Sequence, residues 1–213
     1  SGNISITADT APVPSGSTST SSFGLYILGH RLTSSSGNIS VNATSCSSCS
    51  NPDLVKTSVG LWFQSNTTSY TANSWNQIVT GGAGTITLAG NADHGTLSAT
   101  SYTKAGVYLS FDAATHQVIS TDTGAISITG STSGNVSTGY GVNLANGKMF
   151  TNSGAITIGG TTTSNSSSVY DYGLRVYQFN IVGGSGAVNL TGTTRGQTYN
   201  PYGFYQYNCA ISS

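Results

Sequence analysis

One short phrase returns six times along the chain, and an internal repeat constrains a fold more than any other sequence feature. The phrase is a small residue, Gly, any residue, Ile or Val, any residue, and then an aliphatic residue. Its glycines, which are 35, 47, 40, 30 and 32 residues apart, are Gly2, Gly37, Gly84, Gly124, Gly154 and Gly186. Such a chain stacks copies of one unit instead of building one irregular core.

A second phrase, Gly–apolar–any–apolar, follows each copy of the first and begins at Gly24, Gly60, Gly106, Gly141, Gly173 and, less cleanly, Gly203. A third apolar position lies five residues before the next first-phrase glycine, at Leu32, Val79, Ile119, Met149 and Ile181. Apolar residues alternate with polar ones in these short runs, and Gly, Ser, Thr and Asn bound them. This period of two predicts β-strands and turns with almost no helix.

The repeated order predicts an all-β fold, namely a parallel β-helix (β-solenoid) of about six turns with three short strands per turn and long loops. Equivalent strands of successive turns would pair about 4.8 Å apart. The glycine before each first-phrase strand fits a corner. An antiparallel sandwich also uses many short strands, but it does not need one phrase at six matched positions. Two interior columns are expected, Ile4, Ile39, Ile86, Ile126, Ile156 and Val188 in one, and Ile6, Val41, Leu88, Ile128, Ile158 and Leu190 in the other.

We predict a single domain over residues 1–213, with repeats that start near residues 1, 36, 83, 123, 153 and 185. Charged residues make up 6% of the chain, against roughly 25% in ordinary globular domains. Because the net charge is also zero, we expect no nucleic-acid partner. No run of 18 apolar residues occurs, so we expect no membrane insertion.

Both ends of the sequence resemble interior parts of a repeat. Ser1 lies inside a first phrase, and residues 208–213 resemble a third strand. If Ser213 were joined to Ser1 of another copy, Ile211 would stand four residues before a glycine, close to the internal spacing of five. No polar cap, of the kind that normally protects open strand edges, is evident. We therefore expect the partners to be copies of the chain stacked end to end, or adjoining repeats of a longer chain.

The phrases at residues 123–130 and 153–160, in a chain rich in Ser, Thr, Gly and Asn, carry a family resemblance. They resemble the repeats of large secreted bacterial surface proteins, the filamentous-haemagglutinin-like and autotransporter-type adhesins. The resemblance covers nearly the whole chain. It implies a right-handed parallel β-helix that is exported to the bacterial cell surface and acts there as a stalk or adhesive fibre. The repeats are longer than the compact coils usual in that family, so loops should protrude, and no binding residue is carried over.

The outward positions of the second phrase predict a surface column. If the turns stack, the column contains Tyr26, Trp62, Tyr108, Asn143, Arg175 and Tyr205. Three aromatic residues in adjacent turns would form a platform for sugar rings or for a partner's surface. The long loops could instead fold over this face and bury it. Both outcomes stay open at this point.

The cysteines suggest at most a disulfide. Cys46 and Cys49 form a CxxC pair without a second pair or a nearby histidine, which argues against zinc. In an exported protein, a disulfide between these two residues is the default. Cys209 is left over, either as a free buried thiol or as a bond to a neighbouring copy.

Little in the sequence indicates catalysis, and we expect neither an enzyme nor a cofactor or metal. Glycoside hydrolysis generally needs two facing carboxylates, and Asp112 and Asp122 are the only pair that could converge. The three histidines share no repeat position and have no metal-ligand spacing. The expected function is therefore that of an extracellular structural shaft or self-assembling fibre. A glycan-binding adhesin segment is the alternative, and a polysaccharide lyase or hydrolase comes third.

Overall fold

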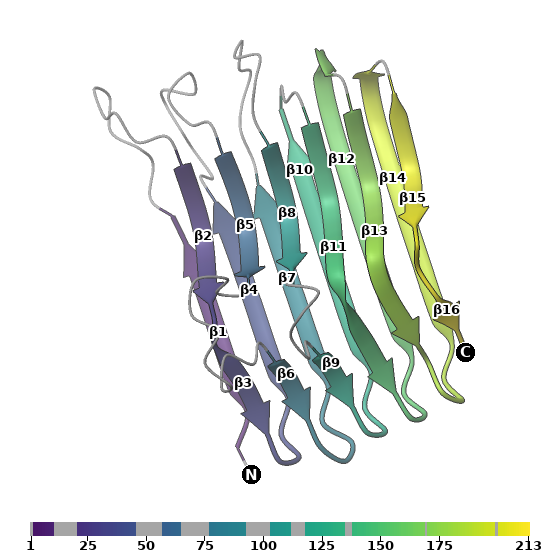
Figure 1. Cartoon of the computed structure of the whole chain (residues 1–213). Coiled ribbons are helices and arrows are strands. Elements are labelled where there is room, and N and C mark those ends of the chain that lie inside the picture. Colours follow the sequence, from purple (N-terminus) through teal and green to yellow (C-terminus); the bar gives the residue numbers. More distant parts are fainter. Residues whose placement is uncertain are drawn as a thin grey trace.

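The computed structural model describes residues 2–10, 21–45, 57–64, 77–92, 103–111, 118–134, 138–168, 170–198 and 200–213. These residues form strands and no helix, and the strands build two sheets that lie face to face (Figure 1). Every pairing between the described strands is parallel. The predicted all-β, parallel architecture is confirmed and is consistent with a β-solenoid. The antiparallel sandwich is excluded.

The first sheet is built from the first phrase of each repeat. Ile126 pairs with both Ile86 and Ile156, so the predicted column runs through the sheet in register. The second column does the same, with Ile128 between Leu88 and Ile158. The strands, in spatial order, are β1 (Ile4–Asp9), β4 (Ile39–Ser45), β7 (Ile86–Ala92), β10 (Ile126–Ser133), β12 (Ile156–Ser168) and β14 (Val188–Thr198).

The second sheet contains the second and third parts of each repeat. Its main strands are β2 (Ser21–Leu28), β5 (Thr57–Gln64), β8 (Thr103–Ser110), β11 (Thr138–Thr151), β13 (Tyr170–Val182) and β15 (Pro201–Tyr207). The described part of this sheet also contains short strands. Of these, β9 (Val118–Thr121) pairs with the later half of β11, and β16 (Ile211–Ser212) pairs with that of β13. The ladder continues from β9 to β6 (Gln77–Thr80) and from β6 to β3 (Arg31–Ser34).

The expectation of three short strands per repeat holds only in part. In β11 and β13 the second and third strands run together as one strand of 14 and 13 residues. A corner remains inside them, because Asn146 and Gln178 have φ values of 58° and 50°. Asn208 (φ 51°) and Gly29 (φ 69°) stand at the matching place in other repeats. Residues in this left-handed region turn the chain sharply, and the second sheet therefore curls without losing its ladder.

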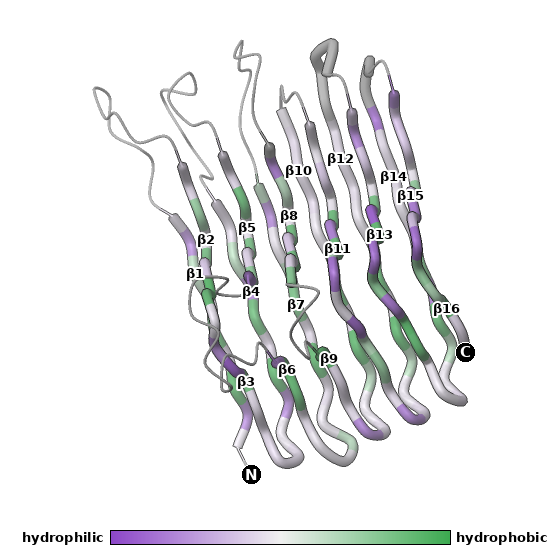
Figure 2. The backbone as a smooth tube through the Cα atoms, viewed as in Figure 1, coloured by the Kyte–Doolittle hydropathy of each residue, from purple (hydrophilic) through white to green (hydrophobic). Residues whose placement is uncertain are grey.

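The apolar columns fill the space between the sheets. Ile39, Ile86, Ile126 and Ile156 are 0% exposed, and the hydrophobic segments of neighbouring strands lie side by side in Figure 2. In the outermost strands, Ile4 and Val188 still pack against this core but are only partly buried. The interior therefore runs through the described structure from one edge strand to the other.

Glycines hold the two sheets in backbone contact along one line. A Cβ on Gly160 of β12 would lie 1.9 Å from the Gly173 carbonyl oxygen of β13, and one on Gly173 would lie 2.2 Å from the Thr193 nitrogen. We call this line the glycine pinch. It contains Gly90, Gly130, Gly160 and Gly192 of the first sheet and Gly24, Gly60, Gly106, Gly141, Gly173 and Gly203 of the second. The glycines of the second phrase are therefore required for contact between the sheets, a role that the sequence analysis did not assign.

The pinch predicts a sharp difference between two adjacent glycines. Gly160→Ala should lower the free energy of unfolding by at least about 2 kcal/mol, because the added methyl group forces the sheets apart. Gly159→Ala in the same strand meets nothing within 4 Å, so the free energy should stay unchanged or rise by about 0.5 kcal/mol. Urea unfolding of the two variants measures both values. Equal changes in the free energy of unfolding for the two variants would contradict the close contact at the pinch.

Candidate functional site

The predicted surface column exists as an aligned row across the second sheet. Trp62 pairs with Tyr26 on one side and with Tyr108 on the other. Asn143 then pairs with Tyr108 and Arg175, and Arg175 pairs with Tyr205. The register expected for these six positions is confirmed.

A second row of aromatic residues, which the sequence analysis missed, lies beside the first. It includes Phe23, Tyr140, Tyr172 and Tyr202, each just before a second-phrase glycine. Ring centroids along the two rows are 5.2 Å apart for Phe23 and Trp62, 5.3 Å for Trp62 and Tyr108, 6.2 Å for Tyr108 and Tyr140, 5.3 Å for Tyr140 and Tyr172, and 5.3 Å for Tyr172 and Tyr202. We call this continuous chain the ring ladder. It crosses all the main strands of the second sheet.

The geometry of the ladder changes along its length. Trp62 is tilted by 53° and 54° against Tyr26 and Tyr108. Tyr172 instead stacks almost parallel to Tyr140 and Tyr202, at 10° and 9°. Stacked rings cover one another's faces, so this half of the ladder offers few ring faces on which a sugar could stack.

Arg175 is the cation of the column. Its guanidinium lies 4.6 Å from the Tyr177 ring centroid and 5.8 Å from that of Tyr140, and its Nη1 donates a hydrogen bond to Asn143 Oδ1 at 3.1 Å. Burial raises the pKa of Tyr140 to about 12, although the positive charge of Arg175 acts in the opposite direction. Burial also raises the pKa of Tyr172. These phenols therefore stay protonated at neutral pH.

The residues of the surface column differ in how far solvent reaches them. Tyr26 is 43% exposed, Trp62, Tyr108 and Tyr205 are half-buried, and Asn143 is fully buried. The loops that were expected to cover this face lie outside the described residues, so their covering role stays untested.

Cys209 is a free, half-buried thiol that packs against the core. Its Sγ lies 3.2 Å from the Val176 carbonyl oxygen and 3.0 Å from that of Tyr207. A bond to a neighbouring copy stays a prediction. Cys46 and Cys49, with their expected disulfide, lie outside the described residues, as does Asp112 of the acidic pair.

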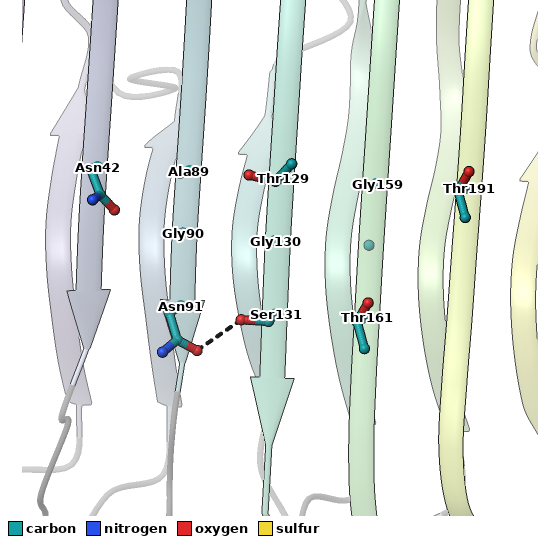
Figure 3. A pocket seen from close by; sticks show the side chains of 11 residues that line it. Asn42, Ala89, Gly90, Asn91, Thr129, Gly130, Ser131, Gly159, Thr161 and Thr191 are labelled. Atoms are coloured by element: carbon teal, nitrogen blue, oxygen red, sulfur yellow. Dashed lines mark hydrogen bonds between the residues drawn. The ribbon is translucent and has the colours of Figure 1, made fainter.

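An open, uncharged groove follows the outer face of the first sheet across five strands (Figure 3). Its volume is about 420 Å³, and pinch glycines Gly90, Gly130 and Gly160 form part of its lining. Its other lining residues are Asn42, Ala89, Asn91, Thr129, Ser131, Gly159, Thr161 and Thr191. Within this lining, the hydrogen bond that joins two side chains runs from Ser131 Oγ to Asn91 Oδ1 (2.9 Å). The groove contains hydroxyls and amides but no charge.

On the side of the pinch away from the aliphatic columns, most of the buried side chains on the inner faces of the sheets are polar. The buried polar residues there are Ser22, Ser45, Ser58, Lys104, Thr132, Thr162 and Asp171. The hydroxyls of Ser45 and Ser58 lie 2.6 Å apart, and Thr132 Oγ1 donates to the Tyr140 carbonyl. Burial lowers the pKa of Lys104 from 10.5 to about 8.

Comparison with protein-family models, with curated proteins and with solved structures finds no match for this chain. In the part of the chain that the structure describes, no three His, Cys or acidic side chains come close enough to hold a metal ion. The same part contains no helix long and apolar enough to span a membrane.

Lys104 predicts a stability that depends on pH. Because its pKa is lower in the folded chain, the unfolded chain holds more protons between about pH 8 and pH 10, and the free energy of unfolding rises with pH there, by about 2 kcal/mol. Above pH 10, Tyr140 and Tyr172 reverse the trend, because unfolded tyrosines lose protons that the folded ones keep. Urea unfolding between pH 7 and pH 11 measures this curve. Lys104→Met should flatten its rising part, and a rise that persists in this variant would contradict the assignment.

Proposed function

We propose that the chain is a structural β-solenoid, a shaft segment of an extracellular fibre at a bacterial cell surface. In this proposal the chain is a right-handed parallel β-helix of about six turns and has no enzymatic role. The support is physical: a parallel ladder, stacked aliphatic columns and very few charges together give a rod that salt disturbs little. The resemblance of the repeats to secreted adhesins supports the location.

The observation that carries this proposal is that the interior is open at the edges of the sheets. Phe204 and Ile211 are 42% and 36% exposed, whereas Leu174 and Ile181, with which they pair, are 0% exposed. Among the described strands, β14 pairs with β12 alone and β1 with β4 alone. A further rung on either edge would continue the ladder and bury these side chains.

The partner that fits such an edge is another repeat of the same kind. Its strands would present the same phrase in the same register, and its aliphatic side chains would cover those of the edge. The repeat can belong to a second copy of the chain, stacked end to end, or to an adjoining part of a longer chain. Burial of one large apolar side chain at the junction contributes about 2 kcal/mol.

A tandem chain, with Ser213 of one copy joined to Ser1 of the next, tests the stacking. We expect one cooperative thermal transition at a higher temperature than that of the single copy, because the junction buries the open interior. Phe204→Lys in the leading copy should remove the gain, since it places a charge in the junction. The same substitution in the trailing copy should leave the gain in place. Two copies that unfold independently at the single-copy temperature would contradict the proposal.

Glycan binding is the second candidate function, and the uncharged groove on the first sheet is the observation that favours it. A neutral, extended polysaccharide fits a groove that has hydroxyl and amide groups along its sides and no charge. The distance from one sugar to the next in such a polysaccharide is close to the strand spacing of about 4.8 Å. Successive sugars would therefore meet successive strands of the sheet. The ring ladder is the other surface for this function, at its tilted end around Trp62.

Two substitutions in β12 test the groove. Gly159→Tyr should abolish binding to neutral polysaccharides on a glycan array, because the ring projects into the groove from a position with nothing within 4 Å. Thr157→Tyr is the control, since this exposed residue precedes Gly159 by two and does not line the groove. Binding that survives Gly159→Tyr and is lost in Trp62→Ala would assign the glycan to the aromatic column.

A further inference from the structure

Within the described part of the chain, Tyr177 and Tyr207 form a stacked pair on neighbouring parallel strands. Their centroids are 5.2 Å apart and their planes differ by 13°. The ladder imposes this contact, because Tyr177 of β13 pairs with Tyr207 of β15 in register. Neither ring belongs to the ring ladder, whose tyrosines contact one another and Trp62.

One member of the pair is open to reagents and the other is held in place. Tyr207 is 52% exposed, the largest exposed fraction of any large hydrophobic side chain in the described residues. Tyr177 is half-buried, and the Arg175 guanidinium lies 4.6 Å from its ring centroid. The exposed ring can therefore meet an oxidant in solution while its partner stays beside it.

We propose that Tyr177 and Tyr207 are an oxidative cross-linking site, at which a one-electron oxidant joins the two rings into dityrosine. Each phenol loses one electron and one proton to become a tyrosyl radical. The radicals then form a carbon–carbon bond between ring positions adjacent to the hydroxyls, and the rings regain aromaticity by moving their remaining hydrogens to oxygen. With a peroxidase, one hydrogen peroxide accepts both electrons and both protons and becomes two water molecules.

The fold favours this coupling over random encounters. Two groups held side by side react as if at a very high local concentration, so the intramolecular product should form even in dilute solution. The inference rests on the proposed function, because a shaft under mechanical load benefits from a covalent link between rungs. The link joins residues 30 positions apart, and such a closed loop restricts the unfolded chain as a disulfide does.

Peroxidase and hydrogen peroxide, applied to the purified chain at low micromolar concentration, test the site. We expect a monomer that has lost two hydrogen atoms by intact mass, a cross-linked peptide that contains Tyr177 and Tyr207, and a higher unfolding temperature. Tyr207→Phe and Tyr177→Phe should each eliminate this peptide. Tyr26→Phe is the matched control and should leave the yield unchanged, because Tyr26 is 43% exposed but its ring neighbours are Phe23 and Trp62.

The proposal is overturned if only dimers and larger species form, or if the peptide map places the link between other tyrosines. It is also overturned if a link between Tyr177 and Tyr207 forms as readily in the urea-unfolded chain as in the folded one. These outcomes are separate from the tandem-chain experiment, since the cross-link lies within one copy and needs no assembly. Circular dichroism of the Phe variants confirms that they fold.

Discussion

The parallel register is the constraint on which the rest of this structure depends. Each residue in a strand lies about 4.8 Å from the residue at the same position of the next repeat. The surroundings of each side chain therefore include the equivalent side chains of the neighbouring repeats. Ile126 is buried because Ile86 and Ile156 flank it in register. The same rule gathers aromatic rings into two neighbouring rows, hydroxyl and amide groups into others, and glycines into the pinch. The different kinds of side chain are therefore separated by the face of the sheet on which they lie, and not by their region of the sequence.

The glycine row has the largest consequences for the shape of the interior. Where Gly160 meets Gly173, no side chain fits between the sheets. The space between the sheets is divided at this line into a larger apolar part and a smaller polar part, which holds Lys104 and Asp171. The same glycines also line the groove on the outer face of the first sheet. One short approach between backbones thus shapes the core, the polar interior and the groove.

Much of the fold could be predicted from the sequence, because alternating apolar residues in a repeated phrase specify both the strands and their register. The rest depends on contacts between sheets, which a repeat pattern does not contain. The repeat pattern by itself shows no role for the second-phrase glycines, whereas Gly141 lies where the sheets touch. For the same reason the row of Tyr140 and Tyr172 was missed, since these residues precede the phrase that was taken as the strand. The continuous strands β11 and β13 were missed because Asn146 and Gln178 turn the chain without breaking its ladder.

The two candidate functions make different demands on the aromatic residues, and ring geometry separates them. A glycan needs ring faces that solvent can reach, and the near-parallel stack of Tyr140, Tyr172 and Tyr202 covers those faces. Stacked rings instead add contact between successive rungs, about 1 kcal/mol for each pair. In a shaft, this stacking opposes the separation of successive turns along the axis of the rod. In the proposed shaft, the stacked half of the ladder would serve cohesion, and the glycan recognition proposed as the second function would use the tilted rings around Trp62 and the uncharged groove on the opposite sheet.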